Sequence, residues 1–99
     1  MSSLSSIALS GMNAAQTSLN ASAHNIANSN TSGFRRQEVV QTPQAQGGVA
    51  TSLKRADAEG SSLETDVVAQ LQAKNAFLAN LAVFKTSNKM AGALLDKTA

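Results

Sequence analysis

Cysteine, tryptophan and tyrosine are absent from this 99-residue chain. Without cysteine, disulfides, thiolate metal sites and cysteine nucleophiles are excluded together. The eight basic residues are spread in ones and twos, and only 3% of residues are aromatic. Nucleic-acid surfaces usually combine a basic stripe with aromatic side chains, so we expect no nucleic-acid partner. The N-terminus has no basic region before an unbroken apolar run, so neither a Sec-type signal peptide nor direct membrane insertion is predicted.

Formal charge is also absent from Met1 to Gly33. A surface helix normally carries charged side chains on its outer face, so a long uncharged helix is expected to be covered by more protein. A chain of 99 residues has room for one small domain, and such domains are often marginally stable alone. We therefore predict a single domain, residues 1–99, that gains stability from a partner.

The first segment, about residues 4–27, is rich in alanine and has heptad spacing, which predicts a helix with a narrow apolar seam. The seam positions are Ala8, Met12, Ala15, Leu19, Ser22 and Ile26. The polar run after Ala27 competes for backbone hydrogen bonds, and Gly33 tolerates positive φ. The helix is thus expected to end near Ala27, with a chain reversal at Gly33.

The middle segment, within the polar stretch 28–60, alternates briefly at residues 37–41 and then contains Pro43 and the pair Gly47-Gly48. A short extended stretch or hairpin fits this pattern. The polar, Gln-rich composition fits a mobile linker equally well. Both alternatives stay open from the sequence.

The third segment begins with Ser61-Ser-Leu-Glu64, which fits a capping box. It predicts a helix over about 62–96, with acidic residues in its first turn and lysines toward its end, as the helix dipole favours. Its apolar residues form two groups. One seam contains Val67, Leu71, Leu78, Leu81 and Leu95, and the other face contains Ala73, Phe77, Val83, Phe84, Met90 and Leu94.

One partner helix cannot cover both faces, so a large apolar surface is expected to remain exposed. The predicted fold class is all-α: two long antiparallel helices, a coiled-coil-like hairpin, joined by an irregular or short β-containing segment. The helices are expected to meet along Met12, Leu19 and Ile26. We favour burial of the remaining surface, including Phe84, against other subunits over a monomeric bundle.

Candidate chemistry is sparse. His24 is the only histidine, and no acidic residue stands beside it at metal-ligand spacing. A role in packing or capping is expected for it. Glu64 and Asp66 are two apart, so they do not face each other as an acid and base would. Arg35 and Arg36 are interpreted as a solvated pair. We predict no enzyme and no catalytic, cofactor or metal site.

Residues 25–36, Asn-Ile-Ala-Asn-Ser-Asn-Thr-Ser-Gly-Phe-Arg-Arg, resemble the N-terminal signature of bacterial flagellar basal-body rod, hook and hook-associated proteins. Residues 8–15, Ala-Leu-Ser-Gly-Met-Asn-Ala-Ala, resemble the start of the same motif. Positions from Ala73 to Leu95 resemble that family's C-terminal helix. The chain departs from the pattern at Ser32, where proline is frequent, and at Lys74-Asn75, where Gln-Arg is usual. Its middle segment is also too short for a folded insert domain.

The resemblance implies a structural subunit of the flagellar rod in the basal body that contributes to motility. Its implied partners are other rod or basal-body subunits, copies of itself and the flagellar type III export apparatus, with export through that apparatus and no cleaved signal peptide. The expected assembly residues are Met12, Leu19, Ile26, Asn28, Gly33, Phe34, Phe77, Asn80, Phe84, Met90 and Leu94.

Two other hypotheses belong to different classes. A rod-like adaptor or regulator would bind the export or basal-body machinery without polymerising, and the missing middle domain favours it. An amphipathic membrane-surface helix is disfavoured, because the chain lacks tryptophan and the first helix has no lysine-lined face.

Overall fold

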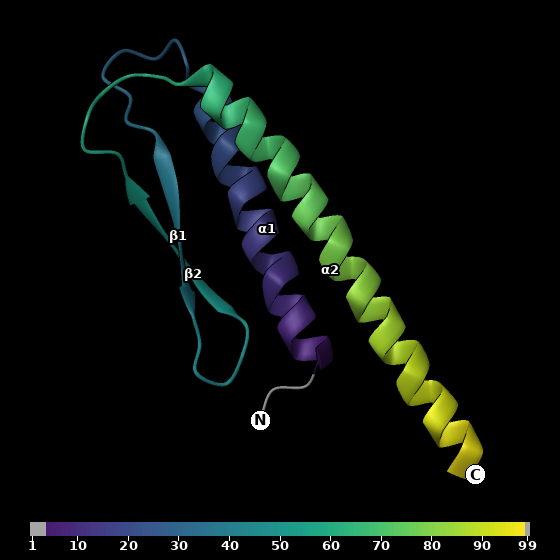
Figure 1. The fold of residues 1–99 in the computed structure, drawn as a ribbon. Coiled ribbons are helices and arrows are strands. Elements are labelled where there is room, and N and C mark those ends of the chain that lie inside the picture. Colours follow the sequence, from purple (N-terminus) through teal and green to yellow (C-terminus); the bar gives the residue numbers. More distant parts are fainter. Residues whose placement is uncertain (1–3, 99) are drawn as a thin grey trace.

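The computed structural model describes residues 4–98, with side chains for residues 4–95. It has two helices and a β-hairpin, arranged along the chain as α1 (Leu4–Ala27), β1 (Gln37–Pro43), β2 (Val49–Arg55) and α2 (Leu63–Thr98). Figure 1 shows α1 in the middle, with the hairpin along one side and α2 along the other. The molecule is long and thin, with principal extents of 62 × 24 × 14 Å.

The hairpin corrects the predicted fold class, because the protein is not all-α. β1 and β2 pair antiparallel in the register Gln37↔Arg55 to Pro43↔Val49. The alternation at residues 37–41 continues through Pro43, which ends β1 where a missing N–H costs little. Gly47 and Gly48 then take positive φ values of 96° and 84° and return the chain. The mobile-linker alternative gives way to this helix–hairpin–helix arrangement.

α1 is buried on two of its sides. Its buried residues are Ala8, Met12, Ala14, Ala15, Ala21, Ser22 and Asn25. Ala8, Ala15 and Ser22 recur every seven residues and share the side toward α2. Ala14 and Ala21 each come one residue before a position of this set. They therefore lie on the neighbouring side of α1, toward the hairpin. Much of the cover expected for this uncharged helix therefore comes from its own chain.

The two helices run antiparallel and approach closely. At one end the Ser5 and Ser87 hydroxyls lie 3.0 Å apart, and at the other Asn25 donates to Asp66. Between these ends, a Cβ added to Gly11 would lie 2.4 Å from Oδ1 of Asn80. The absence of a side chain at Gly11 thus leaves room for the amide group of Asn80 between the helices.

α2 is longer than its partner helix, with 36 residues against 24. At 1.5 Å of rise per residue, that difference is about 18 Å. The last turns of α2 extend past the start of α1 (Figure 1). Met90, in this overhang, is 61% exposed.

The ends of the helices follow local sequence closely. α1 ends at Ala27, and Gly33 has a φ of 73°, as predicted for a chain reversal there. A Cβ at Gly33 would meet nothing within 4 Å, so backbone conformation and not close packing requires the glycine. α2 begins one residue later than the capping box predicted. Ser62 precedes it and donates its hydroxyl to Oγ1 of Thr65 at 2.7 Å, in place of the expected pair of Ser61 and Glu64.

Candidate functional site

A buried polar junction joins α1, the start of β1 and the first turn of α2. Asn25 and Asp66 are each 2% exposed. The Asn25 side chain donates to the Gln37 carbonyl at 2.9 Å and accepts from the Gln37 N–H at 2.7 Å. The same Nδ2 group also donates to Oδ1 of Asp66 at 3.2 Å. One amide side chain therefore holds three elements together.

Arg36 completes the junction by pairing with Asp66. Its Nε donates to Oδ2 at 3.1 Å, and its Nη2 donates to Oδ1, which makes the contact bidentate. Such fork-to-fork pairs combine charge with fixed geometry. The hydrogen bonds that Arg36 donates to Asp66 raise the pKa of Arg36 above its ordinary value, although partial burial opposes the shift. The prediction that Arg36 is solvated was wrong, because its carboxylate partner lies 30 residues away in sequence.

A second, smaller anchor holds the tip of the hairpin against the start of α1. Ser10 Oγ accepts from the Val49 N–H at 3.2 Å and donates to the Ile7 carbonyl at 2.8 Å. A Cβ on Gly47 would lie 2.8 Å from Cδ1 of Ile7, and one on Gly48 would lie 2.6 Å from Oγ of Ser10. The two glycines therefore allow the positive φ values of the turn and also the close approach of the hairpin tip to α1. The hairpin is held at both of its ends.

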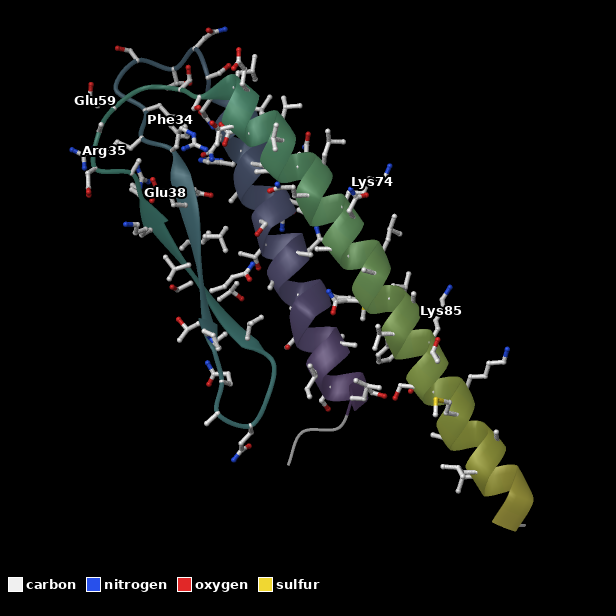
Figure 2. The ribbon with its side chains drawn as sticks, viewed as in Figure 1. Phe34, Arg35, Glu38, Glu59, Lys74 and Lys85 are labelled. Carbon is white, nitrogen blue, oxygen red and sulfur yellow. The ribbon has the colours of Figure 1, made fainter. Side chains whose placement is uncertain are left out.

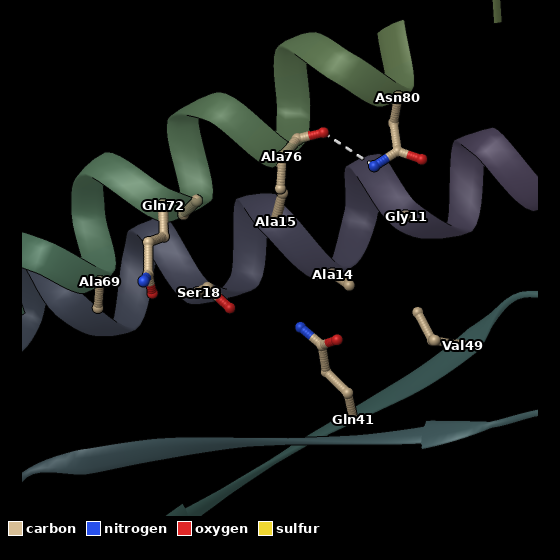
Figure 3. Close-up of a pocket in the computed structure, with 11 residues that line it drawn as sticks. Gly11, Ala14, Ala15, Ser18, Gln41, Val49, Ala69, Gln72, Ala76 and Asn80 are labelled. Carbon is tan, nitrogen blue, oxygen red and sulfur yellow. Dashed lines mark hydrogen bonds between the residues drawn. The ribbon is translucent and has the colours of Figure 1, made fainter. Parts of the chain in front are cut away.

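A shallow groove of about 340 Å³ runs between these two anchors, where both helices and the hairpin meet (Figure 3). Gly11, Ala14, Ala15 and Ala76 form much of its wall, and Gln41 and Val49 close it on the hairpin side. None of its lining residues is charged, and none is a candidate nucleophile paired with a base. Its physical role is close approach of backbones rather than chemistry.

The outer face of α2 exposes large apolar side chains. Val67, Leu71 and Leu78 are 42%, 59% and 51% exposed. They are spaced by four and seven residues and so share one face. Lys74 and Lys85 fall on the same face by spacing, and Figure 2 shows both side chains projecting away from α1. In the first half of α2, buried Ala73 lies toward α1, whereas Val67, Leu71 and Leu78 lie outward.

The predicted assembly residues are distributed over three places. Met12 is buried, and Leu19 and Ile26 are half-buried, on α1. Phe77, Asn80 and Phe84 are half-buried and share the α1-facing side of α2 with Ala73 by spacing. Asn80 also donates to the Ala76 carbonyl at 2.8 Å (Figure 3). Met90 and Leu94 lie in the overhang and are 61% and 65% exposed.

The remaining predicted residues lie in the turn after α1. Asn28 donates to the His24 carbonyl at 2.9 Å and accepts from the Thr31 hydroxyl at 3.2 Å. The rings of His24 and Phe34 lie 5.5 Å apart and are tilted by 57°. His24 therefore packs and supports the turn, in the role predicted for it. This turn lies near the start of α2, whereas the overhang is formed by the last turns of α2, so the two groups of predicted residues are far apart (Figure 1).

Sequence reasoning missed the residues that set the geometry: Gly11, Asn25, Arg36 and Asp66. Asn25 and Gly11 stand inside the motifs that carry the resemblance, which was an available signal. Asp66 was assigned only to the helix dipole, and it does lie in the first turn of α2. Its burial beside Arg36 could not be derived from spacing along one helix.

Two further observations limit what the described part of the chain can do. None of its helices is both long enough and apolar enough to cross a membrane. Within residues 4–95, no three side chains of the types His, Cys, Asp or Glu gather as they would to hold a metal ion.

Comparison with known proteins gives one match. The sequence model of a family described as flagella basal body rod protein matches residues 6–35. The matched segment covers nearly all of α1, the turn at Gly33 and the residues leading into β1. None of the curated proteins compared with the chain matches it. The match supports the resemblance of this segment to the rod protein family, which is a family of structural flagellar components and not of enzymes.

Proposed function

We propose that this chain belongs to the flagellar basal body rod protein family and is a structural subunit of the rod, which assembles through its N- and C-terminal helices and contributes to motility. One observation carries the proposal: the family match at residues 6–35 falls on the most buried helix and on the turn that follows it. The matched segment includes Gly11, Asn25 and Gly33. These residues set the helix approach, the polar junction and the chain reversal.

Exposed apolar surface supports assembly as the mechanism. Val68, Leu71, Leu78 and Met90 are each more than half exposed, and they lie along nearly the whole of α2. Contiguous apolar surface of this kind marks protein contact sites. If contacts between two different surfaces repeat without closing a ring, they produce an open helical array. Folding of the overhang and joining of the array would then be coupled.

The finer parts of the proposal concern partners and location. The expected partners are other rod or basal-body subunits and copies of the chain. The flagellar type III export apparatus would deliver it without a cleaved signal peptide. The proposed contact residues include Met90 and Leu94 in the overhang, together with Asn28 and Phe34 in the turn after α1.

Purified basal bodies provide the decisive test. A tagged chain that is a rod subunit is expected to remain in basal bodies after membranes and soluble proteins are removed, with several copies in each. Leu78→Ala should reduce its amount there, while Leu53→Ala, the same change at an equally exposed leucine of β2, should not. An adaptor would instead be monomeric at all concentrations in light scattering and absent from the purified particles. That result would contradict the subunit role.

A further inference from the structure

The outer face of α2 combines apolar side chains with charge of one sign. No acidic residue occurs between Val67 and Leu95, whereas Lys74, Lys85 and Lys89 do. Among residues 4–95 the ion pairs are Arg36 with Asp66 and Lys54 with Glu38. The lysines of α2 take part in neither. Their charges are therefore available to a partner.

Two of these lysines stand within the heptad of the apolar seam. Val67, Leu71, Lys74, Leu78 and Lys85 are separated by four, three, four and seven residues. This is the spacing of the contact positions of a coiled coil. A lysine at such a position sets the register and the choice of partner, because its ammonium group needs an opposing carboxylate.

A second copy of this chain does not supply that carboxylate. Parallel pairing of two identical faces would place each lysine opposite itself, and antiparallel pairing centred between them would place Lys74 opposite Lys85. Both arrangements bring like charges together. Lys74 and Lys85 are eleven residues apart, yet no two acidic residues of the chain have that separation, and α1 has no acidic residue at all.

We infer that the Val67–Lys85 face binds an amphipathic helix of a different protein, with an apolar seam and two carboxylates about three turns apart. The inference rests on the proposed function, because it specifies one neighbour of the subunit. Apolar contact supplies the attraction, and the two lysines select the partner and its register. Copies of the chain would contact each other through other surfaces.

Binding of designed peptides to the full chain tests this inference. The probe is a 28-residue helical peptide with leucine along a heptad seam and glutamate at two seam positions eleven residues apart. A matched peptide carries lysine at those two positions. Fluorescence anisotropy is expected to show the glutamate peptide binding at least about tenfold more tightly than the lysine peptide, with a preference that weakens at high salt.

Charge reversal sharpens the result. The double variant Lys74→Glu/Lys85→Glu should invert the preference between the two peptides. Arg35→Glu/Arg55→Glu makes the same change in net charge on exposed residues beside the hairpin, and it should leave the preference unchanged. Circular dichroism establishes that each variant is folded. Pairing of the double variant with the wild-type chain would support the inference, because the variant presents two glutamates eleven residues apart on an apolar seam. Equal binding of both peptides, or binding of neither, would overturn it.

The two proposals can fail separately. A chain that enters basal bodies but shows no preference for the glutamate peptide would refute the acidic helix alone. A chain that selects the glutamate peptide but is absent from basal bodies would refute the rod role alone.

Discussion

α1 and α2 differ in how much of their surface is buried within the protein. α1 has seven buried residues among 24, whereas among the described side chains of the longer α2 only Asp66 and Ala73 are buried. The helix without charge is thus the centre of the molecule, between the hairpin and α2. The helix with lysines and two apolar faces turns one of those faces outward. The lack of charge predicted that α1 is covered by protein, and much of that cover comes from its own chain.

A matched pair of methionines should show the difference most strongly. Met12→Ala removes a buried side chain from α1 and is expected to lower the free energy of unfolding by about 2–5 kcal/mol. Met90→Ala makes the same change in the exposed overhang of α2 and should alter it by no more than about 0.5 kcal/mol. Urea unfolding of both variants measures the contrast. Equal losses would mean that α1 is not the core of the isolated chain.

The polar junction should show the next largest effect, because it is the one place where α2 is as buried as α1. Asp66→Asn leaves Arg36 and Asn25 without their carboxylate. Removing one member of a buried pair costs about 3–5 kcal/mol. The Arg36 side chain is 19% exposed, so about 2–4 kcal/mol is expected here. Glu64→Gln, an exposed control in the same turn, should cost less than about 1 kcal/mol.

The pH dependence of the same junction has a definite sign. The pKa of Arg36 is raised, so its contribution to stability is complete below the ordinary pKa of arginine and is lost only as pH rises through the higher value in the folded protein. Alkaline titration to about pH 11 should therefore leave the cost of Asp66→Asn unchanged. A cost that disappeared by pH 10 would show that the guanidinium is not the group paired with Asp66.

Substitutions at two residues on opposite faces of α2 should distinguish an effect on folding from an effect on assembly. Phe84 shares the α1-facing side and is half-buried, so Phe84→Ala should cost about 1–3 kcal/mol, less than for full burial. Leu78 faces outward, and Leu78→Ala should leave thermal unfolding nearly unchanged while lowering incorporation into basal bodies. Circular-dichroism melting and basal-body content give the two readings. The reverse pattern would assign Phe84 to the intersubunit contact that the sequence predicted for it.

The smallest effect is expected at the tip of the hairpin. Ser10→Ala removes the acceptor for the Val49 N–H and should cost about 0.5–1.5 kcal/mol. Amide hydrogen exchange should show faster exchange at Val49, with little change in the core of α1. Ser52→Ala, on the exposed part of β2, serves as the control. Unchanged protection at Val49 would show that Ser10 does not anchor the tip.

Features that depend on neighbouring residues were predictable from the sequence. The chain reversal at Gly33 followed from a polar run beside a residue that accepts positive φ. The first helix and its end at Ala27 followed from heptad spacing and from the polar run after Ala27. The hairpin was left open because residues 37–55 are polar and half-exposed, so no apolar alternation marks both strands.

Features that depend on distant pairs were not predictable. Arg36 and Asp66 are 30 residues apart, and each had a simpler local explanation. The sequence also could not decide which apolar group of α2 faces α1. Both groups have helical spacing, and the choice depends on the close contact between Gly11 and Asn80.

The hydrogen bonds between Asn25 and Gln37 affect the open edge of the sheet at β1. A two-stranded sheet has two open edges, and such edges invite pairing with strands of other chains. The amide of Asn25 offers Gln37 one donor and one acceptor, as the backbone of a third strand would. A helix side chain thus occupies the place where an invading strand would begin to pair. Asn25 thereby closes one end of the open edge of β1 from within the chain.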